Sequence, residues 1–469
     1  MGLFQTLETG KRALLTHQLS LTTIGQNIAN VDTPGYTRQR VDISASDPLK
    51  TTLGMIGTGV RVNDVSHVRD IFLGAQFRQE SKKLGRWNYQ EKILSQIEVM
   101  FNEPGDDTLR AHLEGFFNAW SQLANAPEST TSRNDIVAKA VTLTNDFGQL
   151  SEQLHALKDS VDSDLQVRVE EVNQLSAEIA ALNREIVRHE VGGARANDLR
   201  DRRDLLIDQM SAYVDVNVIE ENDGSARVMI GGMSVVDGHR QLKLETVVEN
   251  TITGQRSSLV YAGSDVEVKN LNGELRGLVE MRDDVIPRYL AQLDELARTL
   301  AREVNNLHAP GYGLQTGGSV TSPTGELFFD VSSVSAQTIK VSERILNDVS
   351  LIAASASGEP GDASVALQMS QLRSLKTMAG GSLTFHEFYG SLVGGVGVEA
   401  KQAKQFKVNQ ELVVQQVDNA REQVQGVSLD EEMTHLIRAQ HAYDAAARVI
   451  TTIDQAFETV IHGMGIVGR

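Results

Sequence analysis

The stretch NIANVDTPGYTRQRVDIS, residues 27–44, contains a turn that separates the start of the chain from everything after it. Pro34 presets φ for the second position of a type II turn, and Gly35 accepts the positive φ that the third position requires. Thr33 and Tyr36 complete the four-residue turn. A helix that precedes this turn must therefore end there, and the first thirty residues form a separate element.

The residues before the turn form an amphipathic helix, and a similar pattern occupies the other end of the chain. Spacings of three and four residues put apolar side chains on one helix face. The first helix carries Leu3, Leu7, Leu14, Leu21, Ile24 and Ile28, and the last carries Leu429, Met433, Leu436, Tyr443, Ala447, Ile450, Phe457 and Ile461. The pattern alone leaves two interpretations open. Both helices cover the core of the remaining chain, or they pair with each other and with copies from neighbouring subunits.

Composition excludes several classes of function. The chain has 469 residues, enough for more than one domain, and its 44 Lys and Arg against 62 Asp and Glu leave a net charge of −18. Such a surface repels nucleic acid and anionic lipid, so neither is expected as a partner. There is no cysteine, which excludes disulfides and thiol chemistry. No stretch reaches the roughly 18 apolar residues of a membrane span, so membrane insertion is not expected.

The interior of the chain predicts long helices. No proline occurs between residues 128 and 286, and an apolar heptad pattern with one inserted step runs from Arg133 to His189. A single helix over this range would extend about 85 Å at 1.5 Å per residue, which is typical of a rod. Further seams follow at 286–307, after Asp283 and Asp284 as the predicted helix start, and at 384–424. We expect these helices to pack as one elongated bundle.

Between the first two apolar seams, the residue pattern changes from that of helices to that of strands. Apolar and polar residues alternate on either side of Asp223-Gly224 and again around Asp237-Gly238, and Asp-Gly pairs favour tight hairpin turns. The predicted fold is mainly α with an inserted β module, an elongated helical-bundle rod and terminal coiled-coil helices. The predicted domains are a terminal coiled-coil domain of residues 1–35 and 428–469, a helical rod of 36–210 and 285–427, and a small β domain of 211–284.

The turn and the end helices together carry a family resemblance. ANVDTPGYTRQRV, with Ala29, Asn30, Thr33, Pro34, Gly35 and Tyr36, resembles the N-terminal signature of the flagellar axial proteins, in which the terminal helices form an inner coiled coil. IGTGVRVNDVSHVRDIFLGAQFRQE and GVSLDEEMTHLIRAQHAYDAAARVITTIDQAFETV narrow the resemblance to the FlgK family of hook-associated proteins. Many members of that family carry two outer domains, whereas here only 211–284 is clearly β and 313–323 reads as a loop.

The resemblance implies a structural adaptor of the bacterial flagellum that joins hook to filament. Such a subunit is made in the cytoplasm, bound there by an export chaperone at its C-terminal helix, exported by the flagellar type III apparatus and assembled outside the cell. Its implied partners are copies of itself in a ring, the hook protein, and the next hook-associated protein on the filament side. Because short isolated helices are marginal in water, we expect the end helices to be unpaired and mobile before assembly.

Chemical alternatives have weaker support. Gly54, Gly57 and Gly59 lack the lysine and the strand-turn-helix order of a phosphate loop, and they are interpreted as turn glycines. His435 and His441 are six residues apart, on different helix faces, so no metal or cofactor is expected. The charged run DLRDRRDLL, residues 198–206, predicts ion pairs rather than a substrate site. Two other functions stay open: another axial subunit of the hook or rod class, and a secreted hydrolase on a helical stalk.

Overall fold

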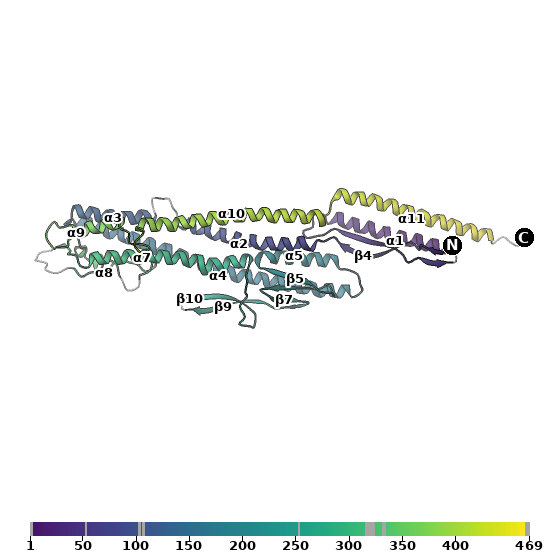
Figure 1. Cartoon of the computed structure of the whole chain (residues 1–469), viewed down its shortest axis with the longest axis horizontal. Helices are drawn as coiled ribbons and strands as arrows, with labels where there is room; N and C mark the ends of the chain where they lie inside the picture. The colour runs from purple at the N-terminus through teal and green to yellow at the C-terminus, as the bar shows by residue number, and fades with distance from the viewer. Residues whose placement is uncertain are drawn as a thin grey trace.

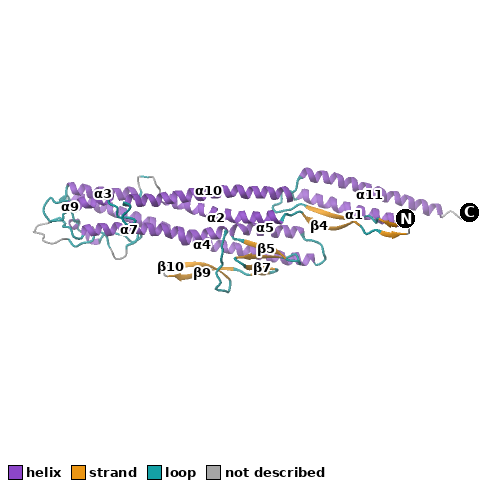
Figure 2. Cartoon of the chain, viewed as in Figure 1, coloured by secondary structure: helices purple, strands orange, loops and turns teal. Residues whose placement is uncertain are grey.

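The computed structural model shows an elongated molecule with both termini at the same end (Figure 1). It describes residues 3–51, 54–101, 105, 108–251, 254–314, 324–330 and 334–464. A terminal module occupies the end with the termini, a long helical rod extends away from it, and a set of strands lies along the side of the rod (Figure 2). The predicted mainly α fold with an inserted β module is therefore confirmed.

The terminal module is built from two helices and two hairpins. Helices α1 (Leu3–Ala29) and α11 (Leu429–Met464) lie side by side. Strands β1 (Gln39–Ala45) and β4 (Val60–His67) form an antiparallel pair beside α1, and β2 (Leu49–Thr51) pairs with β3 (Gly54–Ile56). The prediction that residues 36–210 are wholly helical rod is wrong for this segment. Its alternating apolar residues have the period of two that half-buried strands show.

The rod contains the long helices that the apolar seams predicted. Helix α4 (Thr130–Glu190) is continuous over 61 residues, and α10 (Phe385–Gln425) packs along α2 (Ile71–Phe101). Helices α3 (Leu109–Asn125) and α5 (Asn197–Tyr213) pack against opposite parts of α4. Most of the predicted α4 seam is buried, including Ile136, Leu143, Phe147, Leu154, Val161, Leu165, Val172, Ile179 and Ile186. The heptad pattern of α4 is therefore the core of the rod.

The helix predicted to start at Asp283 starts ten residues earlier. Helix α6 (Gly273–Glu280) runs through a π turn (Met281–Val285) directly into α7 (Ile286–His308). Asp283 accepts from the Arg282 guanidinium, which also pairs with Asp162 at 2.8 Å. The acid therefore serves an ion pair inside a helix rather than a helix N-terminus, and the predicted start was wrong for that reason.

The β module has two parts beside α4. Strands β5 (Val216–Glu220), β6 (Ala226–Ile230), β7 (Met233–Asp237) and β8 (Arg240–Gln241) form an antiparallel sheet in chain order, and β9 (Leu244–Thr251) pairs with β10 (Gly254–Tyr261). Gly224 and Gly238 have φ of 86° and 56°, as the two predicted turns require. The β module is shorter than the predicted range 211–284, because α5 continues to Tyr213 and α6 begins at Gly273.

The β module is attached to α4 by buried amides. The Asn183 side chain donates to the Ala226 and Gly238 carbonyls at 2.7 and 2.8 Å, and the Asn173 side chain donates to the Leu244 carbonyl at 2.9 Å. Apolar residues of the strands belong to the same buried cluster as those of α4. The module therefore shares the core of the rod.

The far end of the rod is closed by short helices and aromatic rings. Helices α8 (Glu343–Asn347) and α9 (Ser364–Gln371) lie there with α3, around the buried rings of Phe116, Trp120 and Phe328. Those rings meet with centroids 5.7 to 6.3 Å apart. Of the predicted loop at 313–323, residues 315–323 lie outside the described part of the chain.

One close approach in the rod requires a glycine. A methyl group at Gly85 of α2 would overlap the carbonyl oxygen of Ala212 in α5. We expect Gly85→Ala to lower the free energy of unfolding by about 3 kcal/mol, because neither backbone can move without disturbing the bundle. Gly115→Ala in α3 is the matched control, since its nearest neighbour, Lys139 Cδ, is 3.8 Å away. Urea denaturation of both variants checks this, and equal midpoints would contradict it.

Candidate assembly site

The two end helices pack against each other within one chain. Phe4 and Phe457 meet with ring centroids 5.0 Å apart near the free end of the pair. A Cβ placed on Gly10 would be 3.1 Å from Ile450 Cγ1, so the helices approach closely there. The expectation that these helices are unpaired in an isolated subunit is therefore wrong. Their apolar faces are complementary enough to pair without a neighbour.

The positions buried in this pair differ from the predicted ladder. The most buried side chains of α11 recur every seventh residue, at Glu432, Ala439, Ala446 and Ile453. The predicted residues Leu436, Tyr443, Ala447, Ile450 and Phe457 are half-buried beside that line, whereas Leu429, Met433 and Ile461 are exposed. All six predicted residues of α1, Leu3, Leu7, Leu14, Leu21, Ile24 and Ile28, are half-buried. The predicted ladder consists mainly of large apolar side chains, whereas Ala439 and Ala446 allow the helices to pack closely.

An apolar stripe remains exposed on the outside of the pair. Leu429, Met433 and Ile437 follow one another at intervals of four along α11, with exposed fractions of 48%, 48% and 50%. On α1, Leu15 and Leu19 are also exposed, at 53% and 36%. We call Leu429, Met433 and Ile437 the outer stripe. Aligned apolar side chains that water can reach are typical of surfaces that contact another protein.

The buried amide of Asn27 joins the pair to the turn. Its Oδ1 accepts from the Tyr36 hydroxyl at 2.8 Å and from the Gln39 backbone N–H at 3.0 Å. Its Nδ2 donates to the Gln39 carbonyl at 2.9 Å and to Glu432 Oε2 of α11 at 3.0 Å. Asn27 is 1% exposed. One side chain thus holds α1, the turn, β1 and α11 together, and the sequence analysis did not single it out.

The predicted motif residues build the turn itself. Asn30 donates to the Gln26 carbonyl at 2.9 Å and accepts from the Thr33 hydroxyl at 3.1 Å. The Tyr36 N–H donates to the Thr33 carbonyl at 3.1 Å, and Gly35 has a φ of 78°. Ala29 and Pro34 are exposed. This is the turn that the sequence predicted, and it ends α1 at residue 29.

The Tyr36 hydroxyl is held in its neutral form. Burial raises the pKa of Tyr36 above its ordinary value, and the nearby carboxylates Asp198, Asp201 and Glu432 raise it further. A neutral hydroxyl donates a hydrogen bond, whereas a phenolate cannot. Tyr36 therefore remains a donor to Asn27 above the pH at which a free tyrosine ionises.

A row of carboxylates on α5 receives the segments that leave the terminal module. Spacings of three, three and four residues put these carboxylates on one helix face. The row consists of Asp198, Asp201, Asp204 and Asp208. At its first end, Asp198 accepts from the Gln39 amide at 2.7 Å. Asp201 accepts from the Thr37 backbone N–H at 3.0 Å and hydroxyl at 2.7 Å, and contacts His67 Nδ1 at 3.0 Å.

The second half of the row binds arginines. Asp204 pairs with Arg69, and Asp208 pairs with Arg78 of α2 and with Arg421 of α10. Burial lowers the pKa of Arg69, and the neighbouring Arg78 lowers it further, whereas Asp208, Glu220 and Asp201 raise it. The prediction that the run at 198–206 makes ion pairs with the bundle is confirmed. We call Asp198, Asp201, Asp204 and Asp208 the α5 row.

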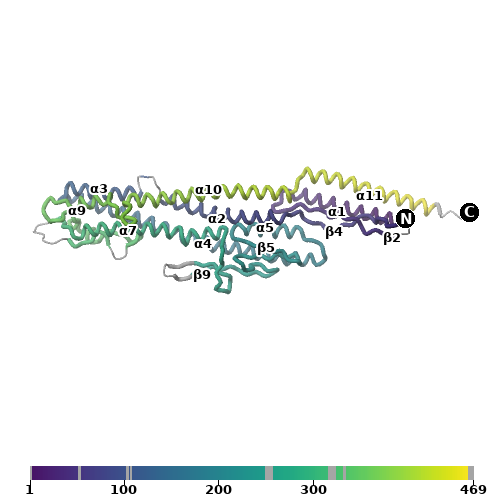
Figure 3. Tube along the Cα trace, viewed as in Figure 1, coloured from purple at the N-terminus to yellow at the C-terminus, as the bar shows by residue number. Residues whose placement is uncertain are grey.

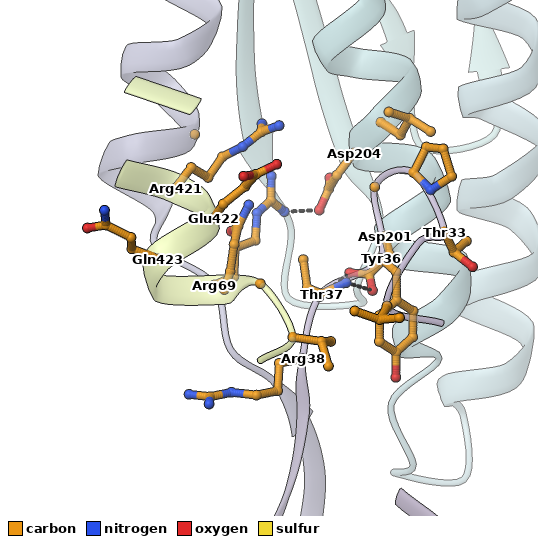
Figure 4. A pocket seen from close by; sticks show the side chains of 18 of the residues that line it. Thr33, Tyr36, Thr37, Arg38, Arg69, Asp201, Asp204, Arg421, Glu422 and Gln423 are labelled. Atoms are coloured by element: carbon orange, nitrogen blue, oxygen red, sulfur yellow. Dashed lines mark hydrogen bonds and ion pairs between the residues drawn. The ribbon is translucent and has the colours of Figure 1, made fainter. Parts of the chain in front are cut away.

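A polar cleft of about 730 Å³ lies where the terminal module meets the rod. Figure 4 shows Thr37 and Arg69 reaching Asp201 and Asp204, with Arg421 on the facing helix. The Arg38 N–H donates to the Gln425 carbonyl at 2.8 Å, which ties the segment after the turn to the end of α10. In the described ranges, no group of three His, Asp or Glu side chains could hold a metal ion, and no helix is long and apolar enough to cross a membrane.

The comparisons with known proteins agree over the whole chain. A family model described as the flagellar hook-associated protein FlgK helical domain matches residues 94–329. Flagellar hook-associated protein 1 of Bacillus subtilis (strain 168) is 33% identical over 506 aligned residues, which cover 99% of each chain. The chain belongs to the FlgK family of flagellar hook-associated proteins. The resemblance predicted from the turn and the end helices is confirmed.

Further similarities cover the ends and the fold. Flagellar hook-associated protein 1 of Escherichia coli (strain K12) is 25% identical and covers 95% of this FlgK-family chain and 97% of its own. Models described as flagella basal body rod protein and flagellar basal body rod FlgEFG protein C-terminal match residues 7–37 and 423–462, which contain most of α1 and α11. The flagellar hook junction protein FlgK from Burkholderia pseudomallei has the same fold, with a TM-score of 0.62 at 17% identity over 74% of this chain and 99% of that one.

Proposed function

We propose that this chain is a structural adaptor subunit of the bacterial flagellum that joins hook to filament. The observation that carries the proposal is the outer stripe on a terminal helix pair that stands clear of the rod. A packed pair with an apolar outer surface suits stacking against copies of itself, because each contact removes apolar area from water. Family membership supplies the position in the flagellum, a structure of the cell surface.

The proposed assembly uses the predicted three-part division of the chain, with the limits that the structure gives. Helices α1 and α11 with strands β1 to β4 belong to the inner tube, helices α2 to α10 form the rod, and strands β5 to β10 form the small β domain. The apolar side chains predicted on the two end helices act in two ways: the half-buried ones hold α1 to α11, and the exposed ones meet neighbouring subunits. The neighbours are further copies in a ring, the hook protein on one side and the next hook-associated protein on the other.

Export precedes assembly in this proposal. The subunit leaves the cytoplasm through the flagellar type III apparatus and folds outside the cell. A cytoplasmic chaperone covers the α11 segment beforehand, since an unfolded chain exposes both the outer stripe and the buried side of that helix to water. The chemistry of the bound surface is apolar, which fits a chaperone groove for an amphipathic helix.

Electron microscopy of flagella from a strain that lacks this gene tests the proposal. We expect hooks without filaments, and restoration of filaments when the wild-type gene is supplied on a plasmid. Normal filaments in the deletion strain would refute the junction role. The second candidate, another axial subunit of the hook or rod class, is favoured by the matches at residues 7–37 and 423–462. This candidate predicts that the deletion strain loses the hook itself. It also predicts that gold-labelled antibody against the protein binds the wild-type flagellum below the junction.

A further inference from the structure

The direction of the terminal pair is not set by a helix that continues into the rod. Helix α1 ends at Ala29 and α2 begins at Ile71, while α10 ends at Gln425 and α11 begins at Leu429. Within the described residues, the chain therefore crosses between the two parts in non-helical segments, at 67–70 and 426–428, and the turn segment 30–38, which leads from α1 to β1, lies beside these crossings. Figure 3 shows the crossings lying together where the purple and yellow ends of the tube meet the rod.

The crossing segments are bonded to one another. The Val68 N–H donates to the Arg38 carbonyl at 2.7 Å, and the Arg38 N–H donates to the Gln425 carbonyl at 2.8 Å. These bonds join the turn segment 30–38 to the crossing at 67–70 and to the end of α10, next to the crossing at 426–428. Movement of one segment must therefore break its bond to the next or carry it along.

The α5 row then binds this group of segments to the rod. Asp201 accepts hydrogen bonds from Thr37 of the turn segment and contacts His67 at the edge of the crossing 67–70. Asp204 pairs with Arg69 of the same crossing. The α5 row thus contacts the crossings from one rigid helix, and Gly35 adds an apolar contact, since a Cβ there would be 3.0 Å from Leu205 Cβ.

Burial makes this attachment firm. Asp201 and Asp204 are 5% and 9% exposed, and Thr37 is 6% exposed. A surface ion pair contributes little to a fixed geometry, but a buried charge that loses its partner is strongly unfavourable. The polar groups of the α5 row and of the crossings must therefore stay in contact. This requirement favours one orientation of the crossings relative to α5.

We propose that Asp201 and Asp204 are positioning residues that fix the angle between the terminal pair and the rod before assembly. A subunit whose terminal pair already points in one direction loses less conformational freedom on joining a ring than one whose pair swivels. The geometric part of this inference stands on the monomer alone. Its use in assembly rests on the proposed function.

Distances between spin labels in the full chain test the geometric part. The chain has no cysteine, so Val191→Cys at the end of α4 and Val449→Cys on α11 place labels only on the two sides of the crossing. Both side chains are exposed, and dilution with unlabelled chain removes distances between molecules. We expect one narrow distance distribution in the wild type. Asp201→Ala with Asp204→Ala is expected to shift and broaden it.

Three controls make the result specific. Labels at Val167→Cys and Val191→Cys both lie on or at the end of α4, and their distance should stay unchanged in the Asp201/Asp204 variant. Asp237→Ala with Asp265→Ala removes the same charge from exposed positions of the β module and should leave the crossing distance narrow. If the α5 variant does not fold, His67→Gln with Arg69→Gln removes the same contacts from the crossing side.

The outcomes separate the two parts of the inference. A broad distribution in the wild type, or an unchanged one in both variants, overturns the positioning role. Broadening of the distance within α4 also overturns it, because the carboxylates would then hold the rod together instead. A variant whose distribution of label distances is broad, yet which restores normal filaments in the deletion strain, overturns the use of the fixed angle in assembly. Failure of the proposed function is seen separately, as normal filaments in that strain without any added gene.

Discussion

A chain with Met433→Asp and Ile437→Asp is expected to fold like the wild type and to leave hooks without filaments. Both side chains belong to the outer stripe and are about half exposed in the single chain, so their loss costs the monomer little. In the proposed ring, each change removes an apolar burial of about 1 kcal/mol and puts a carboxylate in the contact without a partner. The pair should cost more than about 3 kcal/mol per subunit, over a hundredfold in affinity.

Complementation of the deletion strain, followed by counting filaments in micrographs, measures this effect. Circular dichroism melting of the purified variant should match the wild type within a few degrees. Met433→Leu with Ile437→Leu is the matched control, since it keeps an apolar stripe and should restore filaments. Normal filaments with the aspartate pair would mean that the outer stripe faces no neighbour, and the terminal pair would need a different role.

A chain with Ala446→Asp and Ile453→Asp should lose the pairing of α1 with α11 while the rod stays folded. These side chains are 8% and 6% exposed on the face of α11 that is buried in the terminal pair. Burying two unpaired carboxylates and deleting the Ile453 side chain should cost about 3 to 5 kcal/mol, more than a two-helix contact retains. The released helices become marginal in water and open to protease.

Limited proteolysis with mass spectrometry of the fragments measures this second effect. The wild type should resist trimming of its ends, whereas the variant should lose α1 and α11 and leave a stable rod. Val449→Asp is the control: it lies on the same helix at 46% exposure and should behave like the wild type. Loss of the rod together with the ends would show that the two parts fold as one unit.

Long uninterrupted helices were the most predictable part of the fold. Residues 133–189 contain no proline and repeat apolar residues over about eight heptads, a pattern that neither a strand nor a loop would produce. The strands at 39–67 were missed because Val41 and Ile43 alternate for only a few residues, between a turn and several glycines. The start of α6 was missed because Asp283 and Asp284 look like the beginning of a helix but lie inside the π turn that joins α6 to α7.

The site was predictable where it depends on local geometry and not where it depends on partners. Pro34 and Gly35 specify their turn by their own backbone preferences, so the sequence predicted it. Ala439 and Ala446 line the helix contact because they are small, and a search for large apolar residues passes over them. Asn27 and the α5 row have polar side chains whose partners lie up to 405 residues away, and only the folded chain shows which groups they meet.

The length of helix α4 converts a small change of angle at the α5 row into a large displacement at the far end of the rod. The helix runs unbroken from beside the crossings to the aromatic end of the rod, and its 61 residues extend about 90 Å. With the terminal pair held in the proposed tube, a tilt of about 5° at the crossing would carry the far tip sideways by about 8 Å, close to the width of a helix. Two neighbours that differ by so small a tilt would collide or separate at their outer ends. In the proposed ring, the fit of neighbouring rods therefore depends on the few carboxylates of the α5 row.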